Sequence, residues 1–270
     1  GSAHVVFDTH VHVGPRTLRS VFADRPFSVD ALLAEMDGVG IDLAVVFARA
    51  DPTTSYRRHN EFVLSLQQQH PDRFVAFARI NPSFGRSARR DIRDFAARGV
   101  RGLKIHPLID GGANPVNDPA WMGPIMEEAA RQHLVVLIHS GAQPNCTPAL
   151  VGDLAARHPD VDVIMGHSGY RDHYQEAVAA AARWPNIYLD VAGLGGPRVV
   201  RLVVESLGPG QVLYGSDHPV NPFAFELGKV VKYAGLTTAQ RDGVLGQNLA
   251  RLLRLEPPVE PRRLVHAASL

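Results

Sequence analysis

Residues 134–141 read LVVLIHSG, and residues 163–169 read VIMGHSG. In both stretches a short apolar run, typical of a buried strand, ends in His-Ser-Gly, where a loop would begin. Runs of this kind recur along the chain and give eight candidate strands, at residues 5–7, 43–47, 74–80, 102–105, 134–138, 161–165, 187–191 and 212–214. Segments with helical periodicity lie between them, at residues 29–39 (after a Ser28 cap), 60–69, 88–97, 124–132, 150–156, 175–183 and 198–207.

This strict alternation of strand and helix predicts parallel strands joined by right-handed crossovers. Eight such units within ~250 residues fit a closed (β/α)8 TIM barrel better than an open sheet. We expect one α/β domain over residues 1–270, because no linker divides the chain. Residues 224–233 and 238–253 are expected to be C-terminal helices, and residues 256–270 an extended, proline-rich tail. Residues 1–3, Gly-Ser-Ala, look like an expression scar.

The composition favours a small-molecule partner. The chain has 28 basic and 27 acidic residues, a net charge of +1, and no cluster of lysines or arginines. Such a balance gives no electrostatic footprint for nucleic acid or an anionic membrane. The single cysteine, Cys146, cannot form an internal disulfide, and we expect it to be a loop thiol. With no signal-like segment and no long apolar stretch, we expect a cytoplasmic protein.

Six of the thirteen histidines fall at or just past the ends of the candidate strands: His10, His12, His106, His139, His167 and His218. In a barrel of this kind the active site is built from strand ends and the loops that follow them. We therefore expect these side chains to share one pocket.

His10 and His12 lie two residues apart, so both side chains project to the same face of a strand and can reach one ion. A bare His-x-His could equally be two polar caps at a strand end. His139 and His167, at the ends of consecutive strands, favour the metal interpretation. Asp217 ends the eighth strand, which closes the barrel beside the first and brings this carboxylate toward the histidine pair; a turn cap is the alternative role.

Together these residues resemble the amidohydrolase superfamily, specifically amidohydrolase family 2, TIM-barrel hydrolases and decarboxylases. The resemblance spans nearly the whole chain and rests on five motifs in order: Asp8-Thr9-His10-Val11-His12, Gly102-Leu103-Lys104-Ile105-His106-Pro107, Ile138-His139-Ser140-Gly141, Gly166-His167-Ser168-Gly169 and Gly215-Ser216-Asp217. It implies one divalent metal, usually zinc, bound by His10, His12, His139 and Asp217. It also implies that His167 binds a second metal or touches the substrate. Neutral imidazoles with one carboxylate are ligands that suit zinc.

Lys104 is one of only three lysines and falls inside a predicted buried strand. Three roles remain possible for Lys104: an ammonium that binds the substrate, a carboxylated lysine that bridges two metals, and a partner in a structural ion pair. We expect one metal and an unmodified lysine. His106 shares its face and is either a pocket histidine or a polar cap. Each of four arginines in or near the loops after strands, taken alone, is expected at the surface: Arg16, Arg49, Arg79 and Arg171. If one or two of them line the mouth of the pocket, with Arg16 and Arg49 the candidates, they favour a carboxylate-bearing substrate.

We therefore expect a metal-dependent hydrolase of an amide, ester or lactone bond. Asp217 would move the proton of the attacking water, and His167 would hydrogen-bond the developing oxyanion. A non-oxidative decarboxylase with the same metal is the alternative enzyme. A non-catalytic barrel with a regulatory role is the alternative class. The resemblance also makes a homodimer plausible.

Overall fold

The computed structural model describes residues 4–14, 27–51 and 53–256. The expected scar, Arg16 and most of the expected tail lie outside these ranges.

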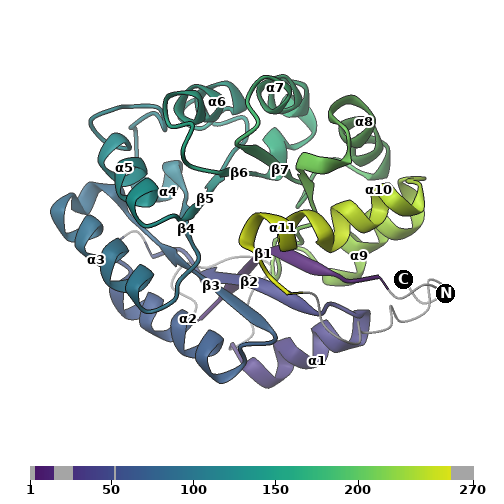
Figure 1. The fold of residues 1–270 in the computed structure, drawn as a ribbon, viewed down its shortest axis with the longest axis horizontal. Helices are drawn as coiled ribbons and strands as arrows, with labels where there is room; N and C mark the ends of the chain where they lie inside the picture. Colours follow the sequence, from purple (N-terminus) through teal and green to yellow (C-terminus); the bar gives the residue numbers. More distant parts are fainter. Residues whose placement is uncertain (1–3, 15–26, 52, 257–270) are drawn as a thin grey trace.

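Eight parallel strands form one sheet in the order β1 to β8, as a TIM barrel requires. They are β1 (Phe7–Val13), β2 (Leu43–Ala48), β3 (Phe74–Arg79), β4 (Gly102–Ile105), β5 (Val135–His139), β6 (Val163–Gly166), β7 (Ile187–Asp190) and β8 (Val212–Leu213). Figure 1 shows the helices arranged around this sheet. The predicted (β/α)8 fold class is confirmed.

The first strand is longer than the sequence indicated. We expected residues 5–7, but β1 continues to Val13, so His10 and His12 lie within the strand and not beyond it. The alternation of Val11 and Val13 with the two histidines keeps the period of two that an extended strand needs. The pairing of β1 with β2 shifts in register between Asp8 and Val11, as at a β-bulge.

The barrel closes where β8 meets β1, by few hydrogen bonds. One isolated parallel bridge joins Val11 to His218. Thr9 N–H donates to the Tyr214 carbonyl at 3.0 Å, and Asp217 N–H donates to the His10 carbonyl at 2.9 Å. This seam therefore places the loop after β8 directly against the His-x-His segment.

The helices that follow β1 to β7 are α1 (Val29–Val39), α2 (Arg57–Gln69), α3 (Arg86–Ala97), α4 (Pro107–Gly111), α5 (Gly123–Arg131), α6 (Pro148–Arg157), α7 (Tyr170–Arg183) and α8 (Pro197–Leu207). The predicted Ser28 cap is confirmed, because its side chain accepts the N–H of Ala31 at 3.3 Å. The short helix α4 was not predicted; it begins at Pro107, a residue suited to the first turn of a helix. None of the helices within the described ranges has the length and apolar character needed to cross a bilayer.

The two C-terminal helices are less regular than expected. α9 (Phe223–Gly228) continues into the π-helical turn η4 (Lys229–Tyr233). α10 (Thr238–Asp242), the π-helical turn η5 (Gly243–Gln247) and α11 (Asn248–Leu253) follow without a break. A π turn inserts one extra residue per turn, and periodicity alone does not reveal it.

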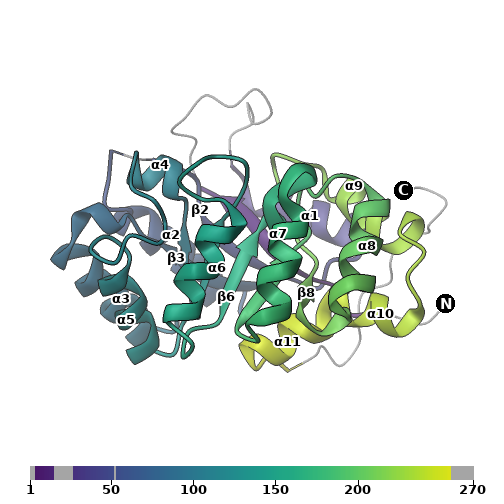
Figure 2. The same ribbon diagram turned by 90° about the horizontal axis from the view of Figure 1, so that it is seen from above.

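The last helix closes one end of the barrel. Leu249 and Leu253 of α11 pack with Phe7, Val45 and Leu137 of the strands in a buried apolar cluster. Figure 2 shows α10 and α11 along the edge of the molecule opposite α4, which follows the carboxyl end of β4. The helix α11 therefore covers the end of the barrel opposite the carboxyl ends of the strands, and the polar side chains described below lie at those carboxyl ends.

Candidate active site

Five of the six singled-out histidines form a continuous chain of ring contacts at the carboxyl ends of the strands. The ring centroids of His10 and His12 are 5.4 Å apart, and those of His10 and His167 are 4.7 Å apart. His139 contacts His167 at 4.8 Å and stacks on His106 at 3.8 Å.

The sixth histidine, His218, lies apart from this chain. Its ring stacks on Phe223 with centroids 4.1 Å apart. Its Nε2 lies 3.6 Å from a carboxylate oxygen of Glu35.

Asp217 lies against the His-x-His pair. Its Oδ1 is 2.9 Å from Nε2 of His12 and 3.3 Å from Nε2 of His10. The residue adopts a φ of 64°, an uncommon left-handed conformation for a side chain other than glycine. Burial alone would raise the pKa of Asp217, but the hydrogen bond from His12 and the nearby His167 hold it below its ordinary value. Asp217 is therefore a carboxylate at neutral pH.

The histidines of the cluster are neutral at pH 7. Burial lowers the pKa of His10, His12, His106 and His139, and it lowers the pKa of His167 to about 4. Neutral imidazoles keep the lone pair that a metal ligand requires.

His167 has a defined tautomer. It begins the 3-10 turn η2 (His167–Gly169) with a φ of 62°. Its Nδ1 lies 2.9 Å from the carbonyl oxygen of Ala192. Because a carbonyl only accepts, Nδ1 carries the proton, and Nε2 presents a lone pair to the cluster. The neutral ring thus offers an acceptor or a ligand, and not the hydrogen-bond donor that the sequence-based role of oxyanion stabiliser needs.

Three side chains are close enough to hold one ion. One ligand atom each from His10, His167 and Asp217 lies within 4.8 Å of the other two, and all three residues are buried. Two imidazoles and a carboxylate form a donor set that fits Zn²⁺ or another transition metal. This set shares His10 and Asp217 with the predicted ligands, but it contains His167 in place of His12 and His139.

The two other predicted ligands border this set. His12 Nε2 is engaged with Asp217. Nε2 of His139 is buried and makes no hydrogen bond within the part of the chain that the structure describes. A buried nitrogen without a partner is costly, so His139 is suited to contact a bound ion or substrate.

Lys104 is fully buried in β4. Its Nζ lies 3.3 Å from Nε2 of His10 and 4.8 Å above the ring of Phe47. Burial lowers its pKa to about 7, Arg79 acts in the same direction, and Asp217 acts against it. Lys104 therefore belongs to the cluster.

His106 is positioned by a buried ion pair behind it. The backbone N–H of His106 donates to Oδ2 of Asp110 at 3.2 Å, and the same oxygen accepts from Nη2 of Arg79 at 3.1 Å. Tyr56 donates to Oδ1 of Asp110 at 2.5 Å. The expectation of a surface position for Arg79 is wrong: its side chain is fully buried and structural. Arg171, in contrast, is exposed as expected.

Of the two arginines expected at the mouth, only Arg49 is within the described residues. It follows β2 directly, is half-buried, and donates its backbone N–H to the Val13 carbonyl at 3.0 Å. Arg16 lies outside the described residues.

Asp190 and Tyr170 were missed by the sequence analysis. Oδ2 of Asp190, the last residue of β7, lies 2.5 Å from Nδ1 of His10. The ring of Tyr170 stacks on His167, with centroids 4.5 Å apart and planes 9° apart. An acidic residue at the end of a predicted strand, as in Ile187-Tyr188-Leu189-Asp190, was the available signal for the first; no motif marked the second.

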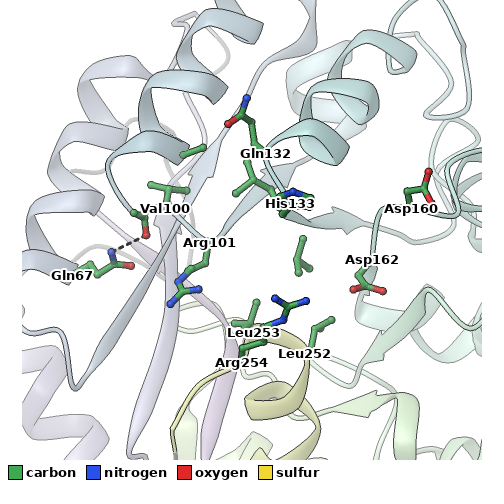
Figure 3. A pocket seen from close by; sticks show the side chains of 14 residues that line it. Gln67, Val100, Arg101, Gln132, His133, Asp160, Asp162, Leu252, Leu253 and Arg254 are labelled. Atoms are coloured by element: carbon green, nitrogen blue, oxygen red, sulfur yellow. Dashed lines mark hydrogen bonds between the residues drawn. The ribbon is translucent and has the colours of Figure 1, made fainter.

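A separate cavity of about 670 Å³ lies at the opposite end of the barrel (Figure 3). It is lined by loops that precede β4, β5 and β6 and by the end of α11. Its charged residues are of both signs: Arg101 and Arg254 face Asp160 and Asp162 across it. None of the clustered histidines lines it, so the cavity is distinct from the candidate active site.

Comparison with known proteins identifies the family. The family model described as Amidohydrolase, that of amidohydrolase family 2, matches residues 7–255. The chain belongs to this family, whose members include hydrolases and decarboxylases. It is 28% identical over 156 residues to an L-fucono-1,5-lactonase of Burkholderia ambifaria. That match covers 50% of this chain and 51% of the relative, so it spans about half the length of each protein.

Solved structures share the fold. A 5-carboxyvanillate decarboxylase from Sphingomonas paucimobilis superimposes with a TM-score of 0.75 at 20% identity, over 94% of this chain and 100% of that one. A 2,6-dihydroxybenzoate decarboxylase from Rhizobium gives 0.75 at 16% identity, over 94% and 99%. A 5-carboxyvanillate decarboxylase from Novosphingobium aromaticivorans, in complex with manganese, gives 0.75 at 15% identity, over 93% and 96%.

Proposed function

We propose that this protein is a metal-dependent hydrolase that cleaves an ester, lactone or amide bond in a small, carboxylate-bearing substrate. The observation that carries the proposal is the convergence of His10, His167 and the Asp217 carboxylate on one point. The partial match to a lactonase supports hydrolysis over the other reactions of the family.

One divalent ion, with zinc the first candidate, would be held by His10, Asp217 and His167, with His12 and His139 at its border. Bound there, it would supply Lewis acidity toward the scissile carbonyl and the attacking water. Asp217, with its lowered pKa, accepts the proton of that water and returns it to the leaving group.

The oxyanion needs a donor other than His167, whose proton is committed to Ala192. Lys104 carries donor hydrogens within the cluster, and its Nζ lies beside Nε2 of His10. We therefore assign to Lys104 either the developing oxyanion or the carboxylate of the substrate.

The test combines metal analysis with identification of products. The purified protein is analysed for metals and then assayed on a panel of aldonolactones, dicarboxylic lactones and N-acyl amino acids, before and after treatment with a chelator. We expect about one divalent ion per chain, ring opening or acyl release without carbon dioxide, and loss and recovery of activity with the metal.

Two results would change this proposal. Release of carbon dioxide from a hydroxybenzoate, with no turnover of the lactones, would assign the decarboxylase reaction instead. Full activity of a protein shown to be free of metal would remove the metal from the mechanism.

A further inference from the structure

The ring of His10 is held from both sides by buried groups. Its Nδ1 lies 2.5 Å from Oδ2 of Asp190, and its Nε2 lies 3.3 Å from Nζ of Lys104. The side chains of His10 and Asp190 are both fully buried. Inside a protein such hydrogen bonds are electrostatically stronger than in water, so these two partners dominate the protonation of the ring.

The partners on the two sides determine where the single ring proton lies. A carboxylate only accepts, so Asp190 as a carboxylate places the proton on Nδ1 and leaves the lone pair on Nε2, which Nζ of Lys104 approaches. Burial raises the pKa of Asp190, whereas the N–H of Ala192 and the nearby Lys104 act to lower it. The competing tautomer would donate Nε2–H to Oδ1 of Asp217, which is also 3.3 Å away, but that oxygen accepts from His12 at the shorter distance of 2.9 Å.

Asp190 itself is fixed in place. Its Oδ1 accepts the N–H of Ala192 at 2.7 Å, and its carbonyl accepts the hydroxyl of Ser168 at 2.7 Å. A Cβ at Gly215 would lie 2.3 Å from Oδ1, so the carboxylate occupies space that only a glycine leaves open. The carboxylate therefore cannot rotate without losing a backbone partner.

We propose that Asp190 is a positioning residue that locks His10 in the Nδ1–H tautomer, so that Nε2 faces the reaction centre as a ligand. The residue acts through His10 and touches neither metal nor substrate. Carboxylates that orient metal-binding histidines in this way commonly change metal affinity by 10- to 100-fold when they are altered.

The Asp190→Asn variant gives a sharp test because its amide has one acceptor and one donor end. Ala192 N–H requires the acceptor, so the NH₂ group is left facing Nδ1 of His10. That arrangement forces the proton onto Nε2 and removes the lone pair from the reaction centre. The exchange of one oxygen for an NH₂ group, nearly without change of volume, thus reverses the tautomer.

The first measurement needs no metal. Nitrogen-15 NMR of the histidine rings, with His10 assigned by the signal lost in His10→Gln, reports which ring nitrogen carries the proton in the metal-free protein. We expect Nδ1–H in the unmodified chain and Nε2–H in Asp190→Asn. A proton on Nε2 in the unmodified chain would overturn the proposal, whether or not the variant folds.

The second measurement is the affinity for Zn²⁺, obtained by titration against a competing chelator. We expect a 10- to 100-fold weaker affinity in Asp190→Asn. The matched control is Asp42→Asn, since Asp42 is a buried carboxylate directly before β2 that accepts the N–H of Val6 at 2.8 Å. Equal losses in the two variants, or unchanged affinity in Asp190→Asn, would refute positioning.

The zinc measurement rests on the proposed metal-dependent function, whereas the tautomer measurement does not. A protein that binds no metal but has the expected tautomers would reject the proposed function and keep the role of Asp190. A protein that binds zinc but has the opposite tautomer would keep the proposed function and reject the role of Asp190.

Discussion

Three properties of Asp217 bear on its proposed role in proton transfer. It is 7% exposed, its backbone is held in a left-handed conformation, and its pKa is below the ordinary value because of His12 and His167. A carboxylate with a low pKa is ionised at neutral pH but is a weak base. Its placement beside the reacting water must therefore compensate for its low basicity.

Asp217→Asn keeps the size of the side chain and removes its basicity. We expect turnover to fall by ~10²–10⁴, with a smaller effect on substrate binding. The exposed Asp172→Asn is the control and should leave turnover unchanged. Steady-state kinetics check the expectation, and near-normal turnover in Asp217→Asn would show that another group moves the proton.

Lys104→Met removes the buried ammonium and keeps the length of the side chain. If Lys104 binds a substrate carboxylate, KM for an anionic substrate should rise by ~10- to 100-fold, the equivalent of one charge-assisted hydrogen bond. Metal analysis should still find one ion per chain. Loss of metal in this variant, or two ions per chain in the unmodified protein, would instead indicate a carboxylated lysine that bridges two metals. The exposed Lys232→Met is the control.

At the scale of elements, the site depends on the close approach of the ends of β7, β8 and β1. Gly215, two residues after β8, lies so near β7 and β1 that any added Cβ meets Asp190 Oδ1 at 2.3 Å and Thr9 Oγ1 at 2.7 Å. The glycine is needed here for close approach of neighbouring strand ends and not for an unusual backbone angle.

Gly215→Ala should therefore destabilise the fold by ~1–3 kcal/mol, since a methyl group is forced into a packed site. Denaturant unfolding gives the free energy, and Gly210→Ala is the control, because a Cβ there meets nothing within 4 Å. Equal stability of the two variants would contradict the prediction, because it would mean that Asp190 and Thr9 move aside for the methyl group at little cost.

Cys146 lies in the loop after β5, as expected, and it is fully buried there, which the sequence did not indicate. Burial raises its pKa from 9.0 to about 11. The thiolate fraction at pH 8 is then about 100-fold below that of a free cysteine, and we expect a matching reduction in its rate of reaction with a disulfide reagent. Because the folded state holds this proton more tightly, the thiol's contribution to stability is full below pH 9 and falls as the pH rises toward 11.

The reagent rate is measured from pH 7 to 11, with the protein unfolded in guanidinium as the control. A rapid reaction of the folded protein at pH 8 would contradict a buried thiol.

For the molecule as a whole, strand and helix order could be predicted because each element carries its own hydrophobic pattern, as in Leu134–Ile138. The end of β1 could not, since a buried strand with histidines at positions 10 and 12 does not look apolar. The π-helical turns η4 and η5 also left no periodic signal.

The positions of candidate site residues were predictable where side chains lie at or just past the ends of apolar strands, as with His139, His167 and Asp217. The hydrogen-bond partners were not, because Asp190 and Ala192 meet His10 and His167 only after the barrel has closed. The burial of Arg79 was missed because its partner Asp110 lies on α4, a helix that the sequence did not indicate.

The seam between β8 and β1 has a consequence for the order of events during synthesis. His12 and Asp217 meet across 205 positions of the chain. Contacts between segments so far apart form late in folding, after local units have formed. A nascent chain thus holds its histidine pair for most of translation without the carboxylate that completes the centre, and the protein acquires its chemistry only when its last strand arrives.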